Sequence, residues 1–446
     1  MYPNLYYIVK DWFGAEIHAL SIINSFGLMV AISFAVAAWL LNIELKRKEK
    51  AGLLAPREEI ILVGNPASIS ELITNGLLGF IFGFKLVGLL LEKAPQINPQ
   101  DYIFSSEGSW LGGIVFGGVM TYLKWHDKNK EKLATPERRT IRIWPHDRVG
   151  DIVVLGLLFG ILGAKLFDNL EHWDEFWADP IGRLFSPSGL TFYGGLILAA
   201  LAICIFAYRK NISIKHLCDA AAPALMIAYA IGRLGCQISG DGDWGIYNSA
   251  YKNDASGNVI VSQPSDFAET AKKYSTYFLE GSTIDNNKKT YVSDRIYPDL
   301  SSIPNKSVKA PSFLPIWLFA YSYPQNVNKD GILMPGITDE HNRVLPSPVF
   351  PTPLYETIIC LVLFSVLWVF RKKIKAPWMM FGFYLILNGI ERFFIEKLRV
   401  NIRYDSSGLN LTQAETIALG LIFCGIFLSV ASFVISNQKQ AKNTKI

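Results

Sequence analysis

The strongest constraint on this chain of 446 residues is the number of long apolar segments that it contains. A helix of about 20 apolar residues crosses the hydrocarbon core of a membrane, and only 18% of the residues here are charged. Nine segments fit this description, at 22–43, 73–91, 110–124, 150–168, 189–208, 216–236, 354–370, 377–396 and 414–436. The third is the shortest and is the weakest candidate for a membrane span. The sequence therefore predicts an all-α polytopic membrane protein with about nine transmembrane helices.

The distribution of lysine and arginine between these segments predicts their orientation, because cytoplasmic loops carry an excess of basic residues. With the N-terminus outside, the inside loops 44–72 and 124–149 hold five and eight basic residues, whereas the outside loops 92–109 and 169–187 hold one each. We therefore expect a cytoplasmic C-terminus. The net charge of +5 then follows from topology and does not indicate a nucleic-acid surface.

One long hydrophilic stretch, 237–352, interrupts the apolar pattern. The topology makes it an extracytoplasmic insert between two parts of a membrane domain, 1–236 and 353–446. Apolar and β-branched patches in the insert predict short strands, whereas DNNKK is typical of an exposed loop. The strands are expected at 259–262, 290–293 and 343–350, and the loop at 285–289.

The membrane part contains an internal repeat. LLGFIFGFKL (77–86) and LLFGILGAKL (157–166) match at six of ten positions, and each precedes a segment with paired glycines. The chain thus carries two copies of one helix pair, 73–124 and 150–208. Glycines let membrane helices approach closely, so we expect Gly112, Gly113, Gly194 and Gly195 to serve packing. The second copy has Tyr193 where the first has Leu111, so the second copy is the better candidate to line a site.

The end of the sixth segment, GRLGCQISGDGDWG (232–245), is the first candidate site. Ionisable residues within membrane segments are costly and are functional candidates for that reason. Arg233 is followed by a glycine-rich turn that contains Gly240 and Gly245 together with Asp241 and Asp243. Such a turn lets backbone N–H groups approach an anion. An arginine at the membrane interface followed by an ordinary loop is the competing interpretation.

The eighth segment, NGIERFFIEKLR (388–399), is the second candidate. Asn388, Arg392, Glu396 and Arg399 share one helical face, at i, i+4, i+8 and i+11. A polar stripe in an apolar helix must face a partner or a wet cavity. An ion pair that joins helices is the structural alternative. Because arginine binds phosphate bidentately, two such arginines near one leaflet predict a phospholipid headgroup as ligand.

Metal and disulfide chemistry are not predicted. The five cysteines lie in or beside apolar segments without paired spacing, and the six histidines are scattered. We expect no bound metal and no disulfide framework.

Taken together, these motifs resemble the prolipoprotein diacylglyceryl transferase family. The resemblance rests on FGLM (26–29), GAKL (163–166), GLTFYGG (189–195), the glycine-rich signature, PLYE (353–356) and RFFIEKLR (392–399), in family order. It implies a seven-span core in the bacterial cytoplasmic membrane, to which this chain adds a helix pair and the insert. It also implies transfer of diacylglyceryl from phosphatidylglycerol to a lipobox cysteine of a prolipoprotein, forming a thioether and releasing glycerol 1-phosphate, without a cofactor.

The resemblance also implies roles for individual residues. Arg233 and Arg392 would hold the phosphate and Glu396 would position Arg392, with Gly240, Gly245, Asn388 and Arg399 in the lipid site. Four positions depart from the family pattern: Phe26 and Asn388 replace tyrosines, Tyr193 replaces a histidine and Cys236 replaces an asparagine. The signature glutamate corresponds to either Asp241 or Asp243. Tyrosine is a weak base at neutral pH, so an orienting or hydrogen-bonding role suits Tyr193 better.

The intramembrane arginines are also compatible with two other classes of membrane protein. A transporter or channel would use the repeat as its moving element, but the repeat covers one helix pair and not half of the molecule. A non-catalytic phospholipid-binding membrane protein is the other alternative. The three differ in whether phosphatidylglycerol is consumed.

Overall fold

The computed structural model describes residues 1–91, 102, 105–186, 191–254, 257–281, 283–285, 288–293, 295–337, 339–400, 403–404 and 411–443. The chain forms two compact units, residues 1–44 with 215–446 and residues 45–214. The loop expected at 285–289 lies partly outside the described residues, as do most of 92–109 and part of 397–413.

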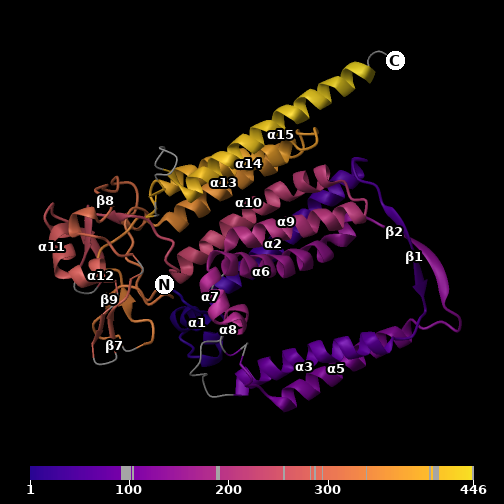
Figure 1. Cartoon of the computed structure of the whole chain (residues 1–446), viewed down its shortest axis with the longest axis horizontal. Coiled ribbons are helices and arrows are strands. Elements are labelled where there is room, and N and C mark those ends of the chain that lie inside the picture. Colours follow the sequence, from indigo (N-terminus) through magenta and orange to yellow (C-terminus); the bar gives the residue numbers. More distant parts are fainter. Residues whose placement is uncertain are drawn as a thin grey trace. The chain divides into compact units, whose positions relative to one another are not determined.

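The first unit contains most of the long helices and all of the hydrophilic stretch. Figure 1 shows α14 running alongside α15, and the two pack closely. Its helices are α1 (Leu5–Phe13), most of α2 (Ser25–Lys50), α10 (Ile214–Ser239), α11 (Asp266–Lys273), α12 (Ser275–Leu279), α13 (Thr352–Phe370), α14 (Met379–Glu396) and α15 (Gln413–Asn443).

The second unit contains two helix pairs and a β-ribbon. Its elements are β1 (Arg57–Val63), α3 (Ile69–Leu91), α5 (Trp110–Lys130), β2 (Glu137–Ile143), α6 (Val149–Glu171), α7 (Trp173–Ala178), α8 (Pro180–Phe185) and α9 (Phe192–Arg209). β1 and β2 are antiparallel, with Arg57 opposite Ile143 and Val63 opposite Glu137. They come from the two basic loops that the topology places on one side of the membrane, and their pairing requires that they share a side.

The internal repeat is a repeat of structure. α3 packs on α5, as Figure 1 shows, and α6 packs on α9. In the first pair, a Cβ at Gly112 would collide with Val87 and the Gly83 carbonyl; in the second, a Cβ at Gly194 would collide with Phe167 and the Gly163 carbonyl. Because these positions correspond between the copies, the paired glycines permit the same close helix contact twice.

The repeated lysines also have a structural explanation. Lys85 Nζ donates hydrogen bonds to the carbonyl oxygens of Tyr102 and Glu107, at 2.9 and 2.8 Å. Lys165 Nζ donates to the carbonyl oxygen of Ser186 at 2.8 Å. Each lysine therefore holds the chain that follows its helix.

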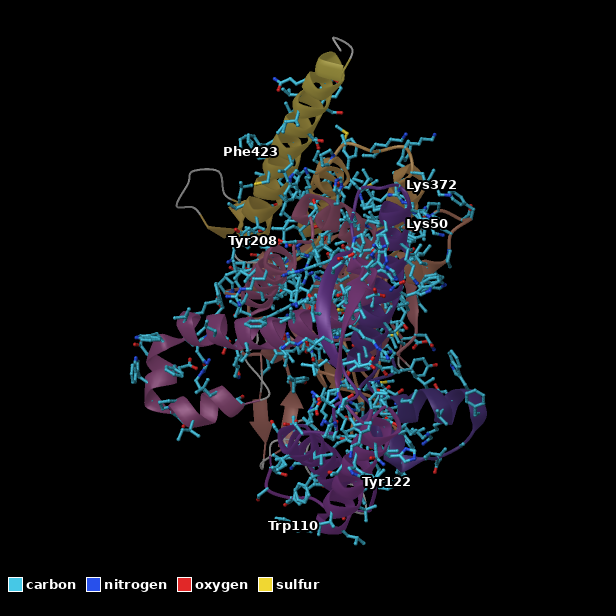
Figure 2. The ribbon with its side chains drawn as sticks, turned by 90° about the vertical axis from the view of Figure 1, so that its right-hand side faces the viewer. Lys50, Trp110, Tyr122, Tyr208, Lys372 and Phe423 are labelled. Carbon is cyan, nitrogen blue, oxygen red and sulfur yellow. The ribbon has the colours of Figure 1, made fainter. Side chains whose placement is uncertain are left out.

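Each of the nine predicted segments contains a long helix in its described part, and seven helices among the described residues are long and apolar enough to cross a membrane. The other two are α5 and α14. α14 contains three charged residues, Glu391, Arg392 and Glu396, which lower its hydropathy. Large apolar side chains on the spans face outward, including Phe423 on α15 and Tyr208 on α9 (Figure 2). The chain is thus a multi-pass helical membrane protein, and the count of nine spans stays a prediction.

The hydrophilic stretch folds around an aromatic core in the first unit. Trp244, Tyr247, Tyr277, Phe278 and Tyr323 are almost fully buried together. The strands are short and pair in twos: β3 (Tyr247–Asn248) with β8 (Asn305–Lys306), β4 (Tyr251–Asn253) with β5 (Val259–Val261), β6 (Thr283–Asp285) with β7 (Lys288–Tyr291) and β9 (Ile332–Leu333) with β10 (Arg343–Val344). Beyond α14, β11 (Arg403–Tyr404) pairs with β12 (Leu411–Thr412).

The chain start and this stretch are joined by backbone contacts. The amino group of Met1 donates to the carbonyl of Pro324 at 3.0 Å, and Tyr2 N–H donates to the carbonyl of Ile238 at 2.9 Å. The predicted topology places the N-terminus and the insert on the same side of the membrane, as these contacts require. The division into membrane parts at 1–236 and 353–446 and an insert at 237–352 stays a prediction.

Candidate active site

The end of α10 carries the first part of the site. Tyr229 and Arg233 lie one helical turn apart, and the Arg233 guanidinium lies 5.3 Å from the centre of the Tyr229 ring. Gly240 ends the helix with a φ of +66°, which L-residues adopt at a cost. A Cβ there would also lie 2.9 Å from Asn326 Cβ. The glycine thus turns the chain sharply and places Asp241 and Asp243 beyond the helix end.

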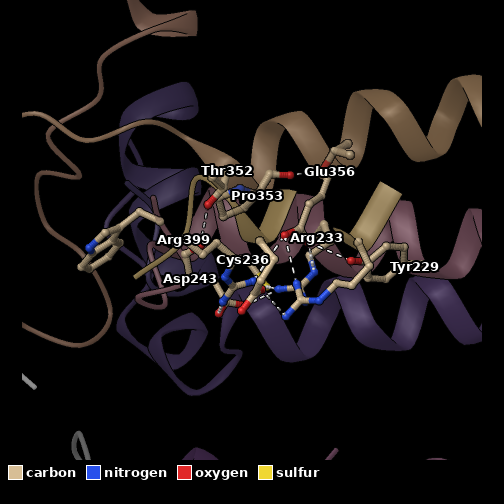
Figure 3. Close-up of polar contacts among 12 residues, drawn as sticks. Tyr229, Arg233, Cys236, Asp243, Thr352, Pro353, Glu356 and Arg399 are labelled. Atoms are coloured by element: carbon tan, nitrogen blue, oxygen red, sulfur yellow. Dashed lines mark hydrogen bonds and ion pairs between the residues drawn. The ribbon is translucent and has the colours of Figure 1, made fainter. Parts of the chain in front are cut away.

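Glu356 lies at the centre of the arginine cluster (Figure 3). It comes from the first turns of α13 and is fully buried. Its carboxylate forms an ion pair with Arg233 Nε, lies 3.3 Å from Arg399 Nη1 and 3.5 Å from Arg392 Nη1, and accepts a hydrogen bond from Tyr229 Oη at 3.0 Å. A buried carboxylate is tolerated only when it is paired. Glu356 therefore ties α10, α14 and the chain after α14 to α13.

Asp243 forms the second bridge between arginines. Its two carboxylate oxygens contact Arg233 and Arg399 separately, and its backbone carbonyl accepts a hydrogen bond from Thr352 Oγ1 at 2.7 Å. Burial opposes ionisation of this carboxyl, but the positive charges of Arg399 and Arg233 outweigh it and lower the pKa of Asp243 from 3.8 to about 2. Asp243 is thus ionised at neutral pH and holds two guanidiniums.

Gly245 explains how Arg399 reaches Asp243. Gly245 pairs with Arg399 in an isolated antiparallel bridge, and its N–H donates to the carbonyl of Phe350 at 2.8 Å. A Cβ at this position would lie 2.7 Å from the Leu398 carbonyl oxygen and 2.9 Å from Thr352 Cγ2. Only glycine lets the two backbone segments approach this closely.

The α14 helix contributes Arg392 and Glu396. Arg392 Nη2 lies 3.3 Å from Glu396, whose other oxygen accepts a hydrogen bond from Thr412 Oγ1 at 3.0 Å. Arg392 Nη1 is buried and donates no hydrogen bond among the described residues. Its nearest anion is the Glu356 carboxylate at 3.5 Å, which is longer than an ordinary hydrogen bond, so it can still donate to an incoming anion. The cluster as a whole balances three guanidiniums against three paired carboxylates, namely Arg233, Arg392 and Arg399 against Asp243, Glu356 and Glu396.

Asp241 and Cys236 lie at the edge of this cluster. Burial and the neighbouring charge of Asp243 raise the pKa of the Asp241 carboxyl above its ordinary value of 3.8. Cys236 Sγ lies 3.8 Å from the Asp243 carboxylate and 3.9 Å from Arg233 Nη1. One donor atom from each of Cys236, Asp241 and Asp243 lies within 4.8 Å of the others, close enough to coordinate an ion. The two guanidiniums on Asp243 would repel such a cation, and we assign no metal to this group.

The structure brings most of the predicted site residues together. Arg233, Asp243, Arg392, Glu396 and Arg399 are joined by direct contacts, and Gly240, Asp241 and Gly245 shape the adjoining turn.

Asn388 and Tyr193 are the remaining predicted site residues. Asn388 is half-buried on α14, and no polar contact links it to the arginines in the described part of the chain. Tyr193 lies in the second unit at the start of α9, with its ring edge-on to Phe192. Its role stays a prediction.

Sequence reasoning missed Glu356, Tyr229 and Glu391. Glu356 lies in the PLYE motif, at the start of an apolar segment, and the cost of burying a charge in a membrane could have singled it out. The same rule applies to Glu391. Its side chain is buried, and neither carboxylate oxygen has a hydrogen-bond partner among the described residues.

Comparison with known proteins places these residues in a family. The model described as "Prolipoprotein diacylglyceryl transferase" matches residues 113–431. A "phosphatidylglycerol--prolipoprotein diacylglyceryl transferase" of Leptospira interrogans is 36% identical over 182 residues, which is 34% of this chain and 53% of the relative. Proteins of the same name from Clostridium novyi and Dehalococcoides mccartyi are 24% and 23% identical over 75% and 78% of this chain, and 96% and 98% of their own lengths. The chain spans about half the length of the relatives it matches at higher identity.

Proposed function

Since the chain belongs to the prolipoprotein diacylglyceryl transferase family, we propose that it transfers the diacylglyceryl group of phosphatidylglycerol to a cysteine thiol in the lipobox of a prolipoprotein. The observation that carries this proposal is the buried cluster of three arginines around Glu356, at the ends of membrane helices. Arginine stays charged in a dry site and matches the geometry of a phosphate. A phospholipid headgroup is the anion that lies at the membrane interface, where these helices end.

The reaction follows from this placement of charge. The thiol sulfur attacks the carbon of the diacylglyceryl group that bears the phosphate. A C–S bond forms, and the bond between this carbon and the phosphate oxygen breaks. The bonding electrons pass to the phosphate oxygen, and glycerol 1-phosphate leaves with an added negative charge. Arg392 Nη1, which has no hydrogen-bond partner among the described residues, is the first donor to meet that charge. Arg233 supports it from α10, and preorganised donors of this kind commonly contribute about 10²–10³ in rate each.

The thiol proton needs an acceptor, and the two aspartates of the signature differ in suitability. Asp243 is held by two arginines and has a pKa of about 2, so it is a weak base. Asp241 has a raised pKa, and no arginine forms an ion pair with it in the described part of the chain. We assign the proton to Asp241 and the positioning of Arg233 and Arg399 to Asp243. Tyr193 is assigned to hydrogen bonding with the phosphate or orientation of the thiol.

The proposal includes a location. The protein would lie in the bacterial cytoplasmic membrane with its N-terminus and residues 237–352 outside, because this orientation places the basic loops in the cytoplasm. The site includes the first residues of this stretch, from Gly240 to Gly245, and Gly240 lies against Asn326 from its later part. We infer that this stretch covers the site or helps to admit the prolipoprotein. Replacing residues 250–347 by a short linker, which keeps Asp241 and Asp243, should therefore lower transfer to a full-length prolipoprotein more than transfer to a short lipobox peptide; the backbones of Asn248 and Pro348 are already hydrogen-bonded at 2.9 Å.

Consumption of phosphatidylglycerol separates the transferase from the alternatives. The purified protein is incubated with phosphatidylglycerol and a lipobox peptide, and glycerol phosphate release is followed together with the mass of the peptide. A peptide with serine in place of its cysteine is the control. We expect release only with the cysteine peptide, and a lower rate for Tyr193→Phe. Folded protein that binds phosphatidylglycerol without release would favour a lipid-binding or transport function.

A further inference from the structure

A second feature of the hydrophilic stretch is an apolar loop at its surface, residues 311–317. Its sequence, PSFLPIW, has no charged residue. Phe313 is 81% exposed and Trp317 is 51% exposed, and Leu314 and Ile316 are exposed as well. The rest of the stretch buries its aromatic residues in a core. A contiguous group of exposed apolar side chains marks an interaction surface.

The base of the 311–317 loop is held firmly by buried polar side chains. The fully buried Asn248 side chain donates hydrogen bonds to the carbonyl oxygens of Val308 and Phe319, at 2.8 and 3.0 Å. Tyr251 Oη accepts a hydrogen bond from Ala310 N–H at 2.8 Å. These contacts fix both ends of the loop, so its apolar apex is presented in one position.

The backbone of the loop is suited to an apolar environment. Leu314 N–H donates to the Pro311 carbonyl at 2.9 Å, and Leu318 N–H donates to the Pro315 carbonyl at 3.2 Å. The two prolines have no N–H to satisfy. Backbone groups without internal partners are costly in lipid, and the two successive turns reduce their number.

The loop is also tied to the end of a membrane helix. Tyr355 Oη donates a hydrogen bond to the Leu318 carbonyl. Tyr355 lies in the first turn of α13, a membrane span that begins at Thr352. The loop is therefore held at the level where this span leaves the membrane, where tryptophan and other aromatic residues concentrate. Lys306 and Lys309, both exposed, precede the loop.

We propose that the 311–317 loop inserts into the membrane interface at the start of α13. Phe313 and Trp317 enter the boundary between headgroups and acyl chains. Lys306 and Lys309 face anionic headgroups, which attract basic residues beside a membrane. The loop thereby fastens the hydrophilic stretch to the lipid surface independently of the transfer reaction.

A fluorescent probe at the loop tests this insertion in the full-length protein. Cys204, Cys218 and Cys424, which are at least partly exposed, are replaced by alanine so that the probe does not label them. Cys236 and Cys360 are kept, because they are buried and protected from labelling. A bimane probe is attached at Phe313→Cys or, as the control, at Glu269→Cys on the exposed face of α11. The protein is reconstituted in vesicles of phosphatidylcholine and phosphatidylglycerol with or without brominated acyl chains.

We expect brominated lipid to quench most of the fluorescence at position 313 and little of that at 269. With Lys306→Glu and Lys309→Glu together, quenching at 313 should fall in vesicles containing phosphatidylglycerol and not in pure phosphatidylcholine. A probe at 313 that aqueous iodide quenches and brominated lipid does not would overturn the proposal. So would protection from iodide that arises only when an apolar lipobox peptide is added, because the loop would then bind the peptide.

Discussion

Replacing Glu356 with glutamine removes one negative charge from the centre of the arginine cluster while preserving its shape. The three guanidiniums and three paired carboxylates then no longer balance, and one buried positive charge is uncompensated. Breaking a buried ion pair costs about 3–5 kcal/mol. Arg233 and Arg399 retain Asp243, and Arg392 retains Glu396, so we expect the free energy of unfolding to fall by about 3 kcal/mol, the lower end of that range.

The same change should lower the rate of transfer, because Glu356 positions all three arginines. Removal of one preorganised donor costs about 10²–10³ in rate, and we expect Glu356→Gln to lower kcat by at least about 10². Thermal unfolding in detergent and glycerol phosphate release measure the two effects. Glu340→Gln is the matched control, since Glu340 pairs with Lys329 at the surface and should change stability by at most about 1 kcal/mol. Wild-type stability and kcat in Glu356→Gln would refute the positioning role.

Three further outcomes follow from the glycine-rich turn. Gly245→Ala should destabilise the fold by about 1–3 kcal/mol, because the new Cβ meets backbone atoms that cannot move freely. Gly420→Ala, in open space on α15, should be tolerated. Thermal unfolding measures both effects. The acid limb of kcat/KM should lie above pH 3.8 and disappear in Asp241→Asn, because burial raises the pKa of the proposed base. Since folding lowers the pKa of Asp243, its stabilising contribution should be present above pH 3.8 and be lost as the pH falls towards 2, and unfolding of Asp243→Asn should not show this loss.

Hydropathy predicted the helices well because the bilayer sets their length and composition directly. Every predicted segment contains a long helix in its described part, and the repeat detected between 77–86 and 157–166 corresponds to equivalent glycine contacts in two helix pairs. The hydrophilic stretch could not be predicted in the same way. Its strands have two to four residues each, and its order comes from an aromatic core assembled from residues far apart in the sequence.

The candidate site, too, could be predicted only in part from the sequence. The helical spacing of Arg392 and Glu396 places them on one face of α14, where they form an ion pair. The spacing predicts Arg399 on the same helical face, but the helix ends at Glu396 and Arg399 lies in a bridge with Gly245. Glu356 was missed because its importance arises from tertiary contacts, which join residues 233, 356 and 399 across the first unit. Likewise, spacing does not distinguish Asp241 from Asp243. The distinction requires the two arginine contacts that lower one pKa and the burial that raises the other.

The most direct measurement compares Arg392→Ala with wild type in the transfer assay, with Arg139→Ala as a control at an exposed position. If Arg392 meets the charge that develops on the departing phosphate, kcat should fall by about 10²–10³, and Arg139→Ala should keep the wild-type rate. A folded Arg392→Ala variant that releases glycerol phosphate at the wild-type rate would contradict the assignment of the arginine cluster as the catalytic site.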